Sequence, residues 1–173
     1  YGRAKRGQGQ VVGIVGGPGV GKSRLLLQLK SVLPSDEYTY LEGDCLHYGD
    51  SIAYLPFLDM LRAYFDFAEG EQESLVITRM AGRIVSLDEK AQDILPPLED
   101  VLSLKVQDEE YLKLEPLQRR EQVFEAIRAL LIRESLNHPL VLAIEDLHWI
   151  DNTSEEFLSY LIDGLANAHI LLL

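Results

Sequence analysis

The hydrophobic positions of this chain form short apolar runs, separated by longer stretches with helical spacing. The run at residues 10–15 contains three valines and an isoleucine, which predicts a buried strand. Residues 140–144 are apolar without alternation, as expected for a strand that is covered on both faces of a parallel sheet. Two further strands are predicted, at residues 38–42, which are rich in β-branched and aromatic side chains, and at residues 169–173, of which the last four are apolar.

Apolar residues recur at helical spacing between these runs. Pro116 opens the clearest helix, since the first turn of a helix tolerates proline. Pro96 and Pro97 predict a break between two short helical pieces, and Thr153 and Glu156 have the spacing of a capping box at the start of the last helix. The predicted helices cover residues 22–33, 56–67, 74–85, 88–95, 97–104, 116–136 and 153–166.

The composition is that of an ordinary globular protein, with 47% hydrophobic residues in a chain of 173. No apolar run approaches the roughly 20 residues that span a bilayer, and no signal-peptide pattern is present. The single cysteine, Cys45, excludes an internal disulfide and fits a reducing compartment. We therefore expect a cytoplasmic protein that makes no membrane contact.

The charge is distributed unevenly along the chain. The net charge is −12, yet the first 30 residues contain six lysines and arginines and no acid. A basic end favours a phosphate ligand, whereas the acidic remainder argues against direct contact with nucleic acid. The basic residues 3–6 are expected to form a solvated, frayed terminus.

Residues 16–23, Gly-Gly-Pro-Gly-Val-Gly-Lys-Ser, fit the phosphate-binding loop pattern G-x-x-x-x-G-K-[ST] at every fixed position, between a predicted strand and a predicted helix. Glycines let backbone N–H groups approach phosphate oxygens, and the helix N-terminus adds a partial positive charge. Lys22 supplies a charge for the β- and γ-phosphates, and the Ser23 hydroxyl is placed to bind Mg²⁺. The sequence thus predicts a nucleoside-phosphate site made of Gly16, Gly17, Pro18, Gly19, Val20, Gly21, Lys22, Ser23 and Arg24.

A second candidate group follows the third predicted strand, which runs directly into Glu145 and Asp146, the Walker B arrangement. Mg²⁺ at Ser23 needs an acid opposite it, and hydrolysis needs a carboxylate that orients or deprotonates the attacking water. By position, Glu145 takes the metal place and Asp146 the water-activating place, and the two roles could be exchanged because Glu145 has the longer reach. For His148 and Trp149, which come next, packing and a role in the site remain equally open.

These residues carry a resemblance to a known family. Residues 16–23 together with Val-Leu-Ala-Ile-Glu-Asp-Leu-His-Trp-Ile-Asp at residues 141–151 resemble the ATPase module of the signal-transduction ATPases with numerous domains, in the AAA+-like P-loop class. Residues 41–57 are similar to the second strand and following loop of the same group. The Glu-Asp-Leu-His-Trp-x-Asp string resembles copies in bacterial adenylate/guanylate cyclases and large LuxR-type transcriptional regulators, although family members often have Asp where Glu145 stands.

The resemblance implies a three-layer α/β fold with a parallel sheet in the strand order 1-4-3-2. The fourth strand would then lie between the first and the third, and residues 10–15 would form an exposed apolar edge. We expect residues 1–173 to be a single, truncated P-loop ATPase domain cut from a longer protein. A helical insertion at about residues 56–115 is expected to pack away from the phosphate loop.

The resemblance also implies a function, which is Mg-ATP binding with slow hydrolysis as a regulatory switch in a multidomain cyclase or transcriptional regulator. The expected partners are ATP and effector domains of the same parent chain, with nucleotide-dependent self-association as a further expectation. A nucleotide-sensing module without significant hydrolysis is the alternative. A P-loop small-molecule kinase is disfavoured because Arg62, Arg79 and Arg83 are too scattered to make an arginine-rich lid. Specificity for GTP is disfavoured because the sequence lacks an Asn/Thr-Lys-x-Asp element.

Overall fold

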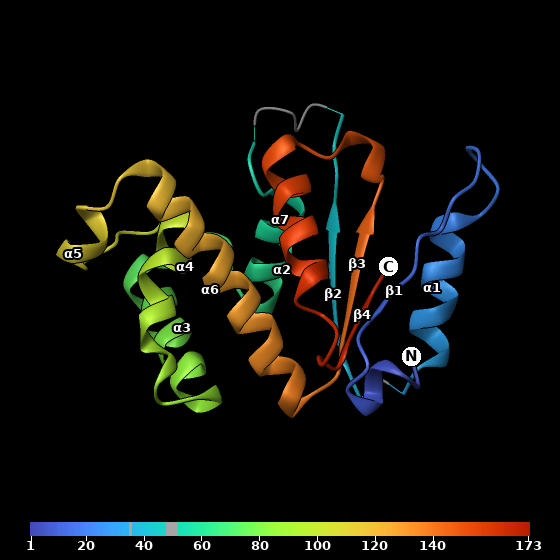
Figure 1. Ribbon diagram of the computed structural model, residues 1–173, viewed down its shortest axis with the longest axis horizontal. Helices are drawn as coiled ribbons and strands as arrows, with labels where there is room; N and C mark the ends of the chain where they lie inside the picture. Colours follow the sequence, from blue (N-terminus) through green and yellow to red (C-terminus); the bar gives the residue numbers. More distant parts are fainter. Residues whose placement is uncertain (35, 48–51) are drawn as a thin grey trace.

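The computed structural model describes residues 1–34, 36–47 and 52–173. At its centre is a parallel sheet with the strand order β1-β4-β3-β2 (Figure 1). Because β4 lies between β1 and β3 and every pairing is parallel, the strand order implied by the resemblance is confirmed. The strands are β1 (Gln10–Val11), β2 (Thr39–Asp44), β3 (Leu140–Glu145) and β4 (Ile170–Leu172).

Helices cover both faces of the sheet (Figure 1). Helix α1 (Lys22–Val32) lies on one face, and α2 (Leu55–Tyr64), α6 (Pro116–Asn137) and α7 (Asn152–Asp163) lie on the other. On the side of α6 that faces away from the sheet, further helices form an outer group that is remote from α1. The remaining elements are η1 (Ala4–Arg6), α3 (Glu73–Leu87), η3 (Ala91–Ile94), α4 (Leu95–Val101), α5 (Glu109–Leu112) and η4 (Leu147–Trp149).

The two faces of the sheet are covered unequally. Leu140 and Leu142 belong to a large core that includes buried side chains of α2, α6 and α7. Val141 points to the opposite face, into a small cluster that contains Tyr38 and Leu171. The continuous apolar run of β3 is therefore buried on both faces, as the sequence predicts, but the layer on the α1 side is thin.

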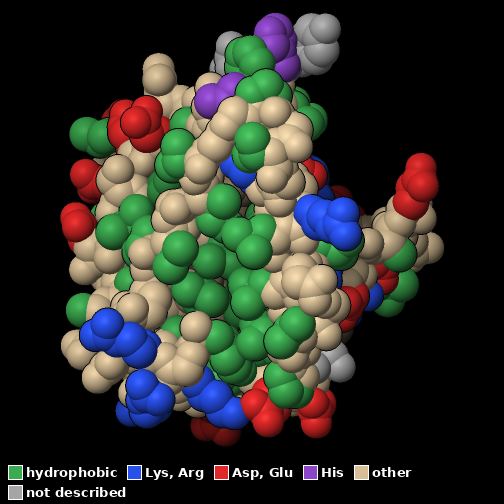
Figure 2. All heavy atoms as spheres, turned by 90° about the vertical axis from the view of Figure 1, so that its right-hand side faces the viewer, with side chains coloured by type: hydrophobic (Ala, Val, Ile, Leu, Met, Phe, Trp, Pro, Cys, Tyr) green, Lys and Arg blue, Asp and Glu red, His purple; other side chains and the backbone are tan. Residues whose placement is uncertain are grey.

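The predicted burial of residues 10–15 is wrong. Regular pairing covers Gln10 and Val11, and one further bond of 2.9 Å joins the Val12 N–H to the Leu172 carbonyl. Val15 is 97% exposed, because no described element covers the outer edge of β1. The expected exposed edge is confirmed, and Figure 2 shows hydrophobic side chains gathered on this side of the molecule. The exposed apolar residues of β1, the loop and α1 are Val11, Val12, Val15, Val20, Leu25, Leu27 and Val32.

Two predicted helix boundaries also need correction. Pro96 and Pro97 do not separate two helices but lie in the first turn of α4, where a missing N–H costs no helical hydrogen bond. The N-cap of α7 is Asp151, whose carboxylate accepts a 2.9 Å bond from the Ser154 N–H and a second bond from the Ser154 hydroxyl. Thr153 therefore lies inside the helix.

The basic N-terminus is ordered, contrary to expectation. Ala4 is 1% exposed within η1, and the Lys5 ammonium pairs with the Glu37 carboxylate. The Tyr1 hydroxyl donates a 3.0 Å bond to the Glu37 carbonyl. These contacts hold residues 3–6 against the segment that leads into β2.

Candidate nucleotide-binding site

The loop between β1 and α1 has a backbone conformation that glycine permits. Gly19 and Gly21 have φ angles of 75° and 98°, in the left-handed region that L-residues with a Cβ rarely adopt. A Cβ at either position would meet no atom within 4 Å, so backbone conformation and not crowding favours glycine there. The whole stretch from Gly16 to Gly21 is exposed, which leaves its N–H groups open to a ligand.

Lys22 is the first residue of α1, and its side chain folds back over the loop. The Lys22 Nζ donates bonds of 3.0 Å and 3.1 Å to the carbonyl oxygens of Gly16 and Gly17. Helix α1 has no side-chain cap and no acid in its first turn, so its leading N–H groups keep their partial positive charge. An ammonium group and a helix N-terminus thus converge at one loop, which suits a phosphate group.

The fold brings together Ser23 and Glu145, the two predicted metal ligands. The Ser23 hydroxyl donates a hydrogen bond to the Glu145 carboxylate at the end of β3, between residues 122 positions apart. Mg²⁺ is bound through one or two protein oxygens together with substrate phosphates and water. Within the described ranges, no cluster of three or more His, Cys, Asp or Glu side chains could hold a metal by itself. Ser23 and Glu145 therefore fit an ion that also binds nucleotide.

Asp146 lies beside this pair at the carboxyl end of β3. Its φ of 52° turns the chain out of the strand, a left-handed conformation that Asp tolerates better than most residues. The Asp146 carbonyl accepts a 2.9 Å bond from the Trp149 N–H, which closes the turn of η4. Because its side chain is exposed at the edge where the phosphate loop also lies, Asp146 can reach water.

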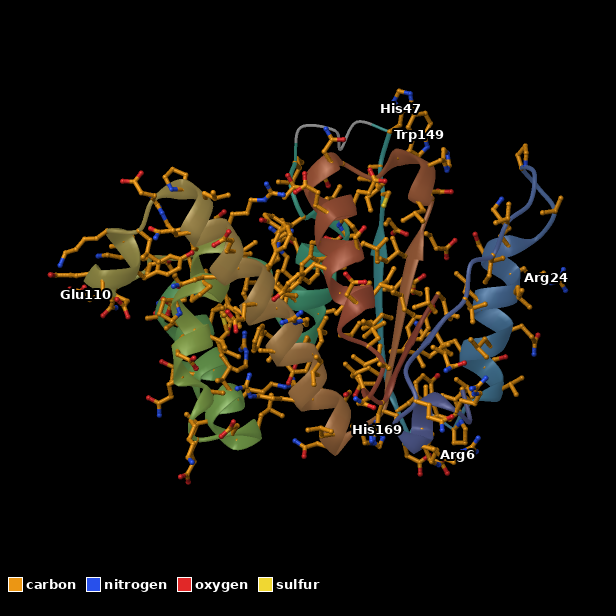
Figure 3. All side chains as sticks on the ribbon, in the orientation of Figure 1. Arg6, Arg24, His47, Glu110, Trp149 and His169 are labelled. Atoms are coloured by element: carbon orange, nitrogen blue, oxygen red, sulfur yellow. The ribbon has the colours of Figure 1, made fainter. Side chains whose placement is uncertain are left out.

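The structure distinguishes His148 from Trp149, whose roles the sequence leaves open. His148 is exposed, whereas Trp149 is half-buried and packs against the main core. The Trp149 ring meets His47 edge to face at a centroid distance of 4.1 Å, and Figure 3 shows the two side chains together at the end of the sheet. Packing therefore accounts for Trp149.

Comparison with known proteins supplies the family. The AAA ATPase domain matches residues 1–173. The chain belongs to the AAA ATPase domain family. Nucleotide binding is the activity that this membership suggests.

This AAA ATPase domain is 29% identical over 168 residues to "Uncharacterized protein R02095" of Rhizobium meliloti (strain 1021). The alignment covers 96% of this chain and 16% of that protein, so the chain spans about a sixth of the length of the relative. No solved structure matches the chain significantly. Across the described ranges, none of the helices combines the length and apolarity needed to cross a membrane.

The AAA ATPase domain contains an acid near its site that the sequence analysis missed. Glu42 of β2 has its pKa raised by burial, and further by the charges of Glu145 and Asp44, while Lys30 opposes the rise. The Lys30 Nζ lies 3.7 Å from the Glu42 carboxylate and 4.3 Å from the centroid of the Tyr40 ring. Burial and the acids nearby raise the pKa of Tyr40 to about 12. The alternation of strand side chains could have revealed this, since Tyr40 and Glu42 must share a face.

These polar contacts help to attach α1 to the sheet. Leu26 is the one buried side chain of α1. The Tyr38 hydroxyl donates a 3.1 Å bond to the Lys30 carbonyl, at the same point where the Lys30 side chain reaches Glu42. Lys30 therefore helps to fix the helix that carries Ser23.

The side chain of Arg24, a predicted binding residue, does not point toward the phosphate loop. Figure 3 shows it on the side of α1 that faces away from the sheet, where it is exposed. Its backbone N–H nevertheless lies in the first turn of α1, beside those of Lys22 and Ser23. A contact between Arg24 and phosphate would therefore run through the backbone.

Proposed function

We propose that this domain binds Mg-ATP and hydrolyses it slowly, as a regulatory switch within a multidomain signalling protein. The observation that carries the proposal is the contact between Ser23 and Glu145, because it joins the phosphate loop to the acid that ends β3. The regulatory role rests on the resemblance of residues 141–151 to cyclases and LuxR-type regulators. The much greater length of the rhizobial relative supports a multidomain parent.

Each residue of the site has a chemical task in this proposal. The loop N–H groups and the Lys22 ammonium would hold the β- and γ-phosphates. Ser23 and Glu145 would hold Mg²⁺, which when bound offsets negative charge on the phosphate oxygens. Asp146, exposed at the same edge, would orient the attacking water and accept its proton. The net charge of −12 argues against contact with nucleic acid, whereas the first 30 residues, which contain six basic residues and no acid, suit ATP.

Replacement of Lys22 by Ala tests the binding site. The substitution removes a charge and leaves the backbone loop intact, so we expect ATP affinity to fall at least about tenfold, which is roughly 1.4 kcal/mol, by isothermal calorimetry. Lys113→Ala is the matched control, because Lys113 pairs with Glu110 on the outer helix α5. Unchanged ATP binding by Lys22→Ala would overturn the proposed site.

A phosphate-release assay under saturating Mg-ATP distinguishes a hydrolysing switch from a sensing module. We expect slow turnover that Lys22→Ala abolishes and Lys113→Ala retains. ATP binding that is intact in calorimetry but gives no phosphate release would favour the sensing module.

A further inference from the structure

A pocket that is open to solvent lies in the helical part of the molecule, away from the phosphate loop. It has a volume of about 590 Å³ and is walled by α2, the end of α4 and the first half of α6. That volume lies in the range of about 300–1,000 Å³ that is usual for small-molecule sites. Leu58, Val101 and Val123 give the pocket apolar walls against which the body of an organic ligand can pack.

The polar groups of this pocket come mainly from the start of α6. Arg119 and Arg120 both line it, although the chain as a whole is strongly acidic. The Arg120 guanidinium is already paired with Glu156 of α7 and lies over the Phe124 ring, 5.1 Å from its centroid. Arg119 donates a 3.2 Å bond from its Nε to the Leu114 carbonyl. Among the described residues no carboxylate forms an ion pair with Arg119.

Asp100, the acid that lines the pocket, also has a hydrogen-bond partner. Asp100 accepts a 2.7 Å bond from the Tyr111 hydroxyl, and burial together with this bond raises the pKa of Tyr111. Tyr111 therefore stays a neutral donor to Asp100 near neutral pH. Asp100 keeps its negative charge, so the lining carries one carboxylate and two guanidinium groups. Arg119 is the guanidinium that has no ion pair among the described residues, and its two terminal nitrogens suit a carboxylate in a bidentate pair.

We propose that this pocket is a binding site for a small organic carboxylate with an apolar body. Arg119 holds the carboxylate, the Tyr54 and Arg120 side chains border it, and the remainder of the ligand packs against the aliphatic walls. The site is separate from the phosphate loop and does not require that the domain hydrolyse ATP.

An NMR titration with 3-phenylpropionate tests the site on the full chain. We expect amide shifts centred on Val101, Ser103 and Val123, with affinity at least about tenfold higher than for the uncharged 3-phenylpropanamide, which corresponds to about 1.4 kcal/mol. Shifts confined to the phosphate loop, equal affinities for acid and amide, or no shift with either compound would overturn the proposal.

Two variants of α6 identify the charge that is responsible. Arg119→Gln should abolish the preference for the acid over the amide and leave amide binding unchanged. Arg133→Gln is the matched control, because Arg133 lies on the same helix and pairs with Asp88 outside the pocket. A preference for the acid that persists in Arg119→Gln, or one that is lost in Arg133→Gln, would refute the assignment.

Side-chain contacts connect this pocket to the helix behind the nucleotide site. Arg120 pairs with Glu156 on α7, the helix that follows the Walker B turn. The Tyr54 ring contacts Phe124 at a centroid distance of 6.0 Å, and Phe124 contacts Phe157 of α7 at 5.2 Å. If binding is coupled, ATP and the carboxylate must change each other's affinity by the same factor.

That coupling rests on the proposed ATP site, and it has its own test. The ATP affinity is measured with and without saturating 3-phenylpropionate, and we expect a change of about fivefold. Glu156→Gln should reduce that factor while the NMR shifts in the pocket persist. An ATP affinity that stays constant, with the carboxylate shifts present, would overturn the coupling and leave the carboxylate site standing.

Discussion

The Ser23 hydroxyl donates its hydrogen bond to Glu145, and this contact ties the first turn of α1 to the end of β3. Both side chains are proposed ligands of one Mg²⁺. Glu145→Gln keeps an acceptor for Ser23 but removes the charge. The affinity for ATP should therefore depend much less on Mg²⁺ in this variant, as calorimetry with Mg²⁺ and with EDTA would measure.

A neighbouring acid serves as the control for Glu145. Asp44 pairs in register with Glu145 across β2 and β3 and is exposed. Asp44→Asn removes the same charge from the same edge of the sheet, and we expect the magnesium dependence to survive. Loss of the dependence in both variants would indicate a general effect of negative charge and would argue against Glu145 as a specific ligand.

Asp146 should affect turnover more than binding. An amide cannot accept a proton from water, so Asp146→Asn should bind Mg-ATP normally and lose about 10²-fold or more in phosphate release. The measurement pairs calorimetry with a single-turnover assay. Normal turnover in Asp146→Asn together with loss in Glu145→Gln would show that the two acids have exchanged roles.

The strands could be recognised from sequence because apolar runs of strand length leave few alternatives. The burial of β3 on both faces follows directly from its unbroken apolar pattern at residues 140–144. The position of β4 between β1 and β3 came from the family resemblance and from no local pattern. Likewise, the adjacency of Ser23 and Glu145 depended on recognising both motifs, since nothing near either residue encodes a contact over 122 positions.

The exposure of β1 and α1 could not be predicted from their apolar patterns. Leu25 and Leu27 have the composition of a buried helix face, yet they are 56% and 67% exposed. Burial depends on whether another element covers the surface, and this is a tertiary property. The prediction of the α7 N-cap is wrong for a similar reason. Asp151 and Thr153 both offer a side-chain acceptor, and only the backbone conformation decides between them.

Glu99 of α4 should make stability depend on pH. It is 6% exposed, and its pKa is raised by burial first and then by Asp108 and Glu73. A raised pKa in the folded state means that the folded protein binds the proton more tightly than the unfolded chain. Its contribution therefore destabilises the fold increasingly as pH rises from the unfolded pKa of about 4.5 through the folded value, and is constant above it.

Glu99→Gln should remove this pH-dependent loss. We expect the variant to gain free energy of unfolding over the parent protein at pH 7 and to gain little near pH 4, as measured by urea denaturation across that range. Glu121→Gln, at an exposed position of α6, should show no such trend. A gain for Glu99→Gln that is the same at every pH would point to packing and would contradict the electrostatic explanation.

Asp151 and Thr153 offer a direct comparison between the cap seen in the structure and the cap predicted by the pattern. Asp151 is 9% exposed and accepts bonds from both the N–H and the hydroxyl of Ser154, which is itself fully buried. Asp151→Ala would leave these buried donors unpaired, so we expect a loss of about 2 kcal/mol and a Tm lower by about 4–8 °C. Thr153→Ala lies within the helix and should change stability by less than about 0.5 kcal/mol. If urea denaturation gave equal losses for the two variants, Asp151 would not be the residue that starts the helix behind the Walker B turn.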